Sequence, residues 1–98
     1  MARKASAEWY GDLRSGKGSM SGSSGAFSDL AFSFRTRFED EPGTNPEELV
    51  AAAHAGCFSM ALSNELASAE LNPESVKTTA AVSLGEKGNG YAITQIQL

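Results

Sequence analysis

The chemistry that this sequence could perform centres on Cys57, the only cysteine in the chain. A cysteine reacts as its thiolate, and a nearby positive charge favours the thiolate. His54 lies three residues earlier, so on a helix the two side chains share one face and the imidazole could support a thiolate. Arg37 is a second cation that could reach inward. These three residues together predict nucleophilic thiol chemistry, provided that the fold brings a cation to Cys57.

Each of these residues also has an ordinary structural role. A free cysteine is often a small buried hydrophobe. A single histidine on an alanine-rich helix face is more often a hydrogen-bonded core or interface residue. An arginine is most often a solvated surface charge. Taken one by one, the residues leave these alternatives open.

Glu47 is constrained by geometry. It precedes Cys57 by ten residues, which places the two about 15 Å apart along the axis of one straight helix. They cannot touch within that helix, so a shared site would need either a bridging side chain or a second subunit. Glu47 is also accounted for as a first-turn acid at the positive end of the helix dipole.

A long helix carries the cysteine, and its start is the clearest local signal in the chain. Asn45 is a good N-cap, Pro46 takes the first helical position, and Glu48 falls where a capping box places its acid. The pattern continues to about residue 69. Because residues 49–62 are almost uncharged and rich in small side chains, the sequence predicts a helix that is buried on most sides.

The other predicted elements are strands, three before the helix and two after it. They lie within residues 5–22, 30–38, 76–84 and 91–98. Alternating apolar and polar residues indicate the strands, and a Gly-Asn-Gly turn joins the last two. A shift of the apolar register between Ile93 and Ile96 predicts either a bulge or a strand that is buried on both faces. The order β-β-β-α-β-β defines a single α+β domain over residues 1–98.

Composition excludes several classes of function. The net charge is −4, and the basic residues are scattered, so we expect no nucleic-acid partner. No apolar run approaches the roughly 20 residues that a membrane span needs. The amino terminus lacks the hydrophobic stretch of a signal peptide. One cysteine cannot form an internal disulfide, so we expect a cytoplasmic protein with a free thiol.

Two other kinds of site are rejected. Residues 11–17 match the first part of a phosphate-binding loop, but Gly18 stands where serine or threonine is required, and no helix is predicted to follow. One histidine and one cysteine three residues apart are too few ligands for a metal. The sequence predicts no metal and no cofactor.

Several motifs together carry a family resemblance. They are TRFE at 36–39, GTNPEEL at 43–49, AAAHAGCFSMAL at 51–62, AEW at 7–9 and GKG at 16–18. They resemble the OsmC/Ohr family of osmotically inducible and organic hydroperoxide resistance proteins. The match is closest to the OsmC branch, whose members carry a histidine at the position of His54.

The resemblance implies a fold and a reaction. It implies an intertwined homodimer around long central helices, with active sites at the interface, and a thiol-dependent peroxidase of oxidative and osmotic stress defence. Cys57 is then the peroxidatic cysteine, Arg37 the guanidinium that holds its thiolate, and Glu47 the acid that orients Arg37. An interface site would also explain the separation of Glu47 from Cys57.

The resemblance also implies a substrate and a reductant. Residues such as Phe38, His54, Phe58 and Met60 would line a pocket that favours organic hydroperoxides over hydrogen peroxide. The reductant would be an external dithiol, dihydrolipoyl groups serving some members.

The chain departs from the family pattern after residue 98. Members continue with a helix that bears a resolving cysteine and with a final strand. We therefore expect that these 98 residues are a fragment of a longer product, or that an external thiol reduces the oxidised cysteine. The competing hypotheses are a catalytically incomplete remnant of the fold and a redox sensor.

Overall fold

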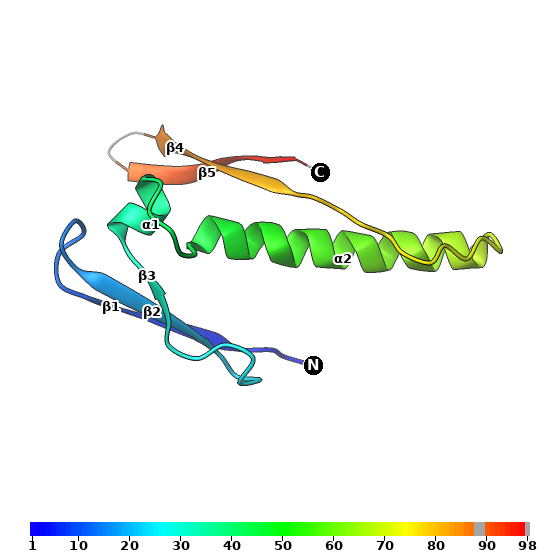
Figure 1. Ribbon diagram of the computed structural model, residues 1–98, viewed down its shortest axis with the longest axis horizontal. Coiled ribbons are helices and arrows are strands. Elements are labelled where there is room, and N and C mark those ends of the chain that lie inside the picture. Colours follow the sequence, from blue (N-terminus) through cyan, green and yellow to red (C-terminus); the bar gives the residue numbers. More distant parts are fainter. Residues whose placement is uncertain (88–89, 98) are drawn as a thin grey trace. The chain divides into compact units, whose positions relative to one another are not determined.

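The computed structural model describes residues 1–87 and 90–97, and the side chains of residues 1–84. Within the described residues, five strands and two helices follow one another, and Figure 1 labels them. They are β1 (Ala5–Tyr10), β2 (Lys17–Gly22), β3 (Leu30–Phe32), α1 (Phe34–Phe38), α2 (Pro46–Ser68), β4 (Ala81–Lys87) and β5 (Gly90–Gln97). The chain divides into two units, Met1–Pro46 and Glu47–Leu98. The predicted α+β class is confirmed, and the single domain over residues 1–98 stays a prediction.

The first unit is built on an antiparallel sheet with the strand order β1-β2-β3. Gly18 pairs with Trp9 on one side and with Phe32 on the other, so the three residues form one row across the sheet. The rings of Trp9 and Phe32 lie 5.5 Å apart between centroids. A Cβ at Gly18 would come within 2.6 Å of the Trp9 ring and 2.7 Å of the Phe32 ring. Glycine is therefore required here, because both rings occupy the space above it. The predicted hairpin over residues 5–22 is confirmed.

The β1–β2 turn is held by Asp12. Its carboxylate accepts hydrogen bonds from the Ser15 backbone N–H (2.7 Å) and from the Ser15 hydroxyl. Its backbone carbonyl accepts from Gly16 N (2.9 Å) and from Trp9 Nε1 (3.1 Å). The turn thus fixes the indole ring, and strand β2 follows where a phosphate-binding loop would need a helix.

These bonds give the turn a pH dependence. The Ser15 hydroxyl and then the Ser15 N–H lower the pKa of Asp12, because they bind its ionised form. Because the pKa of Asp12 is lowered in the folded state, its ionised carboxylate stabilises the turn at pH values above about 3.9, the pKa of an aspartate in the unfolded chain. That stabilisation is lost as the pH falls through the folded-state pKa.

We expect Ser15→Ala to raise the pKa of Asp12, measured by an NMR titration of its carboxyl carbon. Ser24→Ala is the control, and an unchanged pKa in Ser15→Ala would contradict the assignment.

The predicted strand over residues 30–38 is wrong after Phe32. Ser33 has extended backbone angles and caps helix α1, accepting a hydrogen bond from Thr36 N (3.2 Å). Ser33 N donates in return to Thr36 Oγ1 (2.8 Å), which completes a capping box. Phe34 and Phe38 then lie one helical turn apart, with ring centroids 4.8 Å from each other. The same aromatic residues fit a strand by alternation and a helix by their i, i+4 spacing, and the cap selects the helix.

Helix α2 begins at Pro46 as predicted and ends at Ser68, close to the predicted limit of about residue 69. Its end is a Schellman motif, in which Leu71 N donates to Leu66 O (2.8 Å) and Glu70 N donates to Ala67 O (3.0 Å). Glu70 adopts the left-handed conformation that this motif requires, with φ of 63°. The helix therefore stops before Asn72-Pro73.

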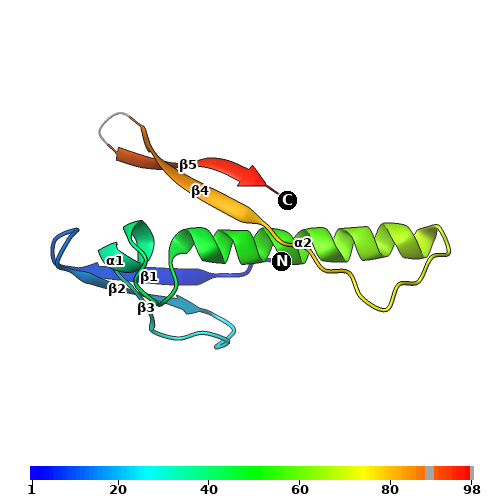
Figure 2. The ribbon, with the colours of Figure 1, turned by 45° about the horizontal axis from the view of Figure 1, so that its top comes forward.

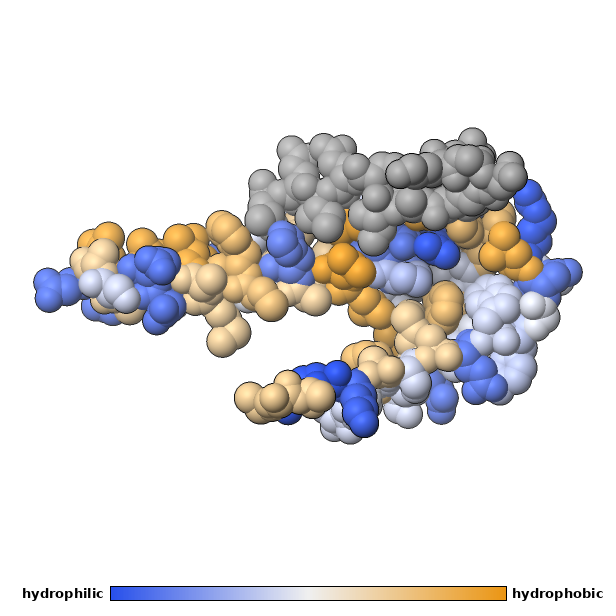
Figure 3. Space-filling model, turned by 180° about the vertical axis from the view of Figure 1, so that it is seen from behind, coloured by the Kyte–Doolittle hydropathy of each residue, from blue (hydrophilic) through white to orange (hydrophobic). Residues whose placement is uncertain are grey.

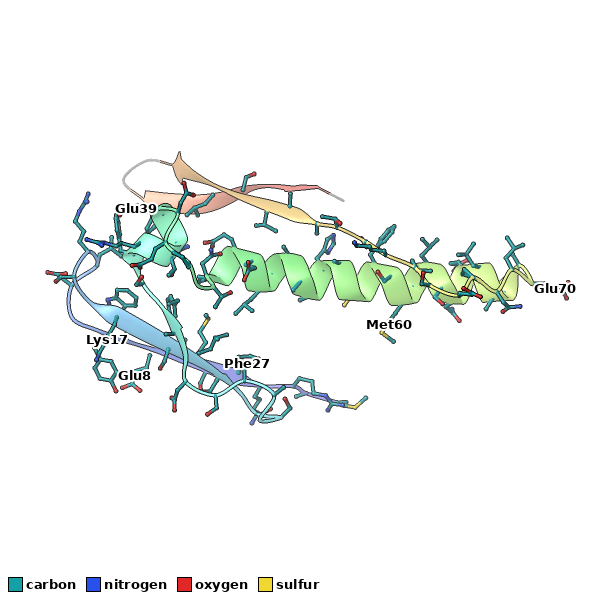
Figure 4. The ribbon with its side chains drawn as sticks, viewed as in Figure 1. Glu8, Lys17, Phe27, Glu39, Met60 and Glu70 are labelled. Atoms are coloured by element: carbon teal, nitrogen blue, oxygen red, sulfur yellow. The ribbon has the colours of Figure 1, made fainter. Side chains whose placement is uncertain are left out.

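The predicted burial of this helix is not found in the single chain. No hydrophobic side chain among residues 1–84 is buried. Phe58 is 42% exposed and Met60 78% exposed, and the Met60 side chain projects away from α2 (Figure 4). Hydrophobic residues lie on the surface over α2 (Figure 3). Apolar residues are distributed around the helix instead of in one stripe, so one neighbouring layer cannot cover them.

The second unit ends in an antiparallel hairpin of β4 and β5 (Figure 2). The predicted strand over residues 76–84 is wrong at its start, because pairing begins at Ala81, opposite Gln97. Residues 71–80 form no strand, and the Ser59 hydroxyl ties them to α2 by donating to Thr78 Oγ1 (2.7 Å). The predicted bulge is confirmed, because the register shifts beside Leu84, which pairs with Ile93. Part of the predicted turn, residues 88–89, lies outside the described residues.

Candidate active site

Cys57 lies in the middle of α2, and its side chain is exposed. His54 lies three residues earlier on the same helix and is also exposed. At this spacing the two side chains share a face of the helix, as the sequence predicts. A mid-helix position is far from both helix ends, so the helix dipole cannot activate the thiol. Any cation that stabilises a Cys57 thiolate must come from a side chain.

Glu47 stands in the first turn of α2 and is the one buried charged residue in the part of the chain with described side chains, at 8% exposure. A carboxylate there meets the positive end of the helix dipole, which is a favourable interaction. Ten residues separate it from Cys57, or about 15 Å along the axis. Within one chain, α2 therefore keeps these two residues apart, as expected.

Arg37 lies on the short helix α1 and is half-buried. Its guanidinium carbon lies 5.2 Å from the centroid of the Phe38 ring, in the range of a cation–π contact. It also lines a cavity of about 160 Å³ in the first unit. The other residues lining this cavity are Trp9, Leu13, Phe32, Ser33, Phe34 and Phe38. The structure thus places Arg37 in an apolar, largely aromatic setting, where its charge is less well screened than in water.

The predicted site residues fall into two groups. Arg37 and Phe38 belong to the first unit, where the structure brings them together in the aromatic cavity. The predicted residues on α2 belong to the second unit: Glu47, His54, Cys57, Phe58 and Met60. Met60 lines a separate hollow of about 240 Å³ between α2 and residues 73–76.

No group of three histidine, cysteine, aspartate or glutamate side chains lies together in residues 1–87 and 90–97 as a metal site would need. In that part of the chain no helix is long and apolar enough to cross a membrane. The chemical groups that the fold presents are thus the thiol on α2, the carboxylate at its start and the guanidinium on α1.

Comparison with known proteins decides the family. The model of the OsmC-like protein family matches residues 38–98, more than half of the chain. The chain belongs to the OsmC family. It is 53% identical over 96 residues to Peroxiredoxin OsmC of Escherichia coli (strain K12), and equally to Peroxiredoxin OsmC of Shigella flexneri. Each match covers 98% of this chain and 67% of the relative, so the chain spans about two thirds of their length.

Sequence reasoning missed most walls of the aromatic cavity in this OsmC-family chain. It named Phe38 as a pocket residue but not Trp9, Phe32 or Phe34. The signal that could have found two of them is the row in which Trp9 and Phe32 flank Gly18, since aromatic residues commonly cover a strand glycine. Phe34 joins the cavity only because α1 is a helix.

Proposed function

We propose that this chain is a thiol-dependent peroxidase that reduces organic hydroperoxides through Cys57. The observation that carries the proposal is the exposed thiol of the chain's only cysteine, in a protein 53% identical to relatives named peroxiredoxin. Thiolates are the nucleophiles in such chemistry, and they must be accessible to the oxidant. The exposed position of Cys57 meets that requirement.

The Cys57 thiolate attacks the terminal oxygen of the hydroperoxide, an S–O bond forms, and the O–O bond breaks. The alkoxide leaves and takes up a proton to become the alcohol, while the sulfur is oxidised to a sulfenic acid. A guanidinium donates hydrogen bonds to anionic oxygen and sulfur alike, so Arg37 would stabilise both the thiolate and the departing alkoxide.

We also propose that the active site is assembled from two copies of the chain. Within one copy, α2 leaves Val50, Phe58, Met60 and Leu62 exposed. Exposed large apolar side chains of this kind favour association. A second copy would cover α2 and could bring the Arg37 and Glu47 of one chain to the Cys57 of the other. Glu47 would then hold the guanidinium by a charge-assisted hydrogen bond.

Turnover requires a second thiol, and the 98 residues contain only one. An external dithiol, such as a dihydrolipoyl group, would attack the sulfenic sulfur, release water and form a mixed disulfide. Its second thiol would then release Cys57 and close the external disulfide. The single cysteine equally suits a redox sensor, in which the mixed disulfide with another protein is the end point.

The test is direct detection of the oxidised cysteine. The chain is treated with one equivalent of cumene hydroperoxide in the presence of a 1,3-dione that traps sulfenic acid. The mass of the peptide that contains Cys57 is then measured by mass spectrometry. We expect the trapped adduct on Cys57 and one equivalent of cumyl alcohol. In a second sample, with excess cumene hydroperoxide and without the dione, continued alcohol formation after addition of dihydrolipoamide supports the peroxidase, and a stable mixed disulfide supports the sensor. Absence of both adduct and alcohol would refute thiol peroxidase chemistry.

A further inference from the structure

The aromatic cavity of the first unit is a candidate small-molecule site. Trp9, Phe32, Phe34 and Phe38 supply rings to its walls. Its volume is about 160 Å³. An apolar cavity of about 150 Å³ is large enough to hold benzene. The cavity therefore suits a phenyl-sized or short branched alkyl group.

Its walls are held in place before any ligand arrives. Trp9 Nε1 donates to the Asp12 carbonyl (3.1 Å), which fixes the indole at the β1–β2 turn. Trp9 and Phe32 both pack against Gly18. Phe34 and Phe38 contact each other within α1, at 4.8 Å between centroids. A preformed pocket binds with a smaller entropic cost than one that must order on binding.

Two guanidinium groups lie against rings that line the cavity, and the Glu41 carboxylate accepts a hydrogen bond from the lining residue Ser33 (3.4 Å). The guanidinium carbon of Arg14 lies over the Phe34 ring, 4.9 Å from its centroid, and Arg37 lies over the Phe38 ring. None of the described residues lining the cavity is acidic. In residues 1–84 no carboxylate forms an ion pair with Arg14. A guanidinium stacked on a ring keeps its N–H edge available to bind a carboxylate with two hydrogen bonds.

We propose that this cavity binds a phenyl-sized organic group that carries a carboxylate, and that Arg14 is the residue that selects the carboxylate. The inference deepens the proposed function and rests on it for the substrate, which becomes an aryl or short-chain hydroperoxide that also bears an acid. Arg37 is committed there to the thiolate and the alkoxide, so a second negative charge on the substrate needs another cation. Arg14, one ring away from the cavity, is that cation.

The test compares two probes that contain no peroxide, 3-phenylpropionate and 3-phenylpropan-1-ol. Calorimetry of the full chain measures affinity, and the fluorescence of Trp9, the only tryptophan, reports binding at the cavity wall. We expect the acid to bind about tenfold more tightly than the alcohol, since its carboxylate accepts charge-assisted hydrogen bonds from Arg14. Arg14→Gln should remove that advantage and leave the affinity for the alcohol unchanged.

Arg35→Gln is the matched control, because Arg35 is exposed on α1 and does not line the cavity. It removes the same charge and should leave both affinities unchanged. An acid that binds Arg14→Gln as tightly as the original chain would overturn the role of Arg14. Binding without any change in Trp9 fluorescence, or no binding at all, would overturn the cavity. Since neither probe is a peroxide, an inert Cys57 would refute the proposed function while leaving these affinities untouched.

Discussion

Cys57→Ser should reduce hydroperoxide consumption to the rate of the protein-free reaction. The serine hydroxyl stays protonated at neutral pH, and its oxygen cannot pass through the sulfenic acid state that the proposed cycle needs. The chain has no other thiol to substitute for it. The rate is measured as loss of cumene hydroperoxide with dihydrolipoamide as reductant. Because the substitution changes one atom at an exposed position, the helix should be retained, and circular dichroism checks this.

The control for this prediction is a variant in which the cysteine is moved to another position on α2. The double variant Cys57→Ser, Ser63→Cys keeps one exposed cysteine on α2, about 9 Å further along the axis. We expect it to remain inactive, since the cation that activates Cys57 would not reach the new position. Consumption at the original rate would show that any exposed thiol suffices and that Cys57 occupies no particular site.

Local signals in the sequence were enough to place α2 and the first hairpin. The start of α2 depends on Pro46 and its neighbours, whose preferences act within one turn and need no tertiary context. Whether residues 34–38 form a strand or a helix depended on a competition between two local patterns. Phe32 and Phe34 alternate as in a strand, while Ser33 and Thr36 form a cap. The cap prevailed because it satisfies backbone groups that would otherwise lack partners.

Long-range features were harder to predict. The start of β4 at Ala81 depends on where β5 pairs, and alternation between Val76 and Ala80 carries no information about the partner strand. The aromatic cavity depends on the register that sets Trp9 and Phe32 beside Gly18. Sequence spacing placed the residues on α2 along their helix. The spacing did not identify what packs over Cys57, because the pattern of apolar residues along a helix does not show which element or chain forms the layer next to it.

Arg37→Ala should lower the rate of Cys57 oxidation by about a hundredfold to a thousandfold, the usual cost of removing one donor that stabilises a developing anion. The thiol should also need a higher pH to become reactive, since the thiolate loses its counter-charge. Both effects are measured from the pH dependence of the reaction with cumene hydroperoxide and with iodoacetamide. Arg37→Lys keeps the charge but loses the planar fork, so we expect an intermediate rate. An unchanged pH profile in Arg37→Ala would remove this residue from the site.

Mixing two inactive variants tests whether Arg37 acts across a dimer. Arg37→Ala chains keep Cys57, and Cys57→Ser chains keep Arg37, so a mixed dimer contains one intact pair only if the arginine of one chain serves the cysteine of the other. We expect activity to reappear when the two variants are unfolded and refolded together, and not when they are assayed separately. Random pairing makes half of the dimers mixed, each with one of its two sites intact, so recovery should approach about a quarter of the original rate per chain if subunits pair without preference. If the refolded mixture stays inactive although sedimentation shows dimers, Arg37 and Cys57 do not act on each other across the interface.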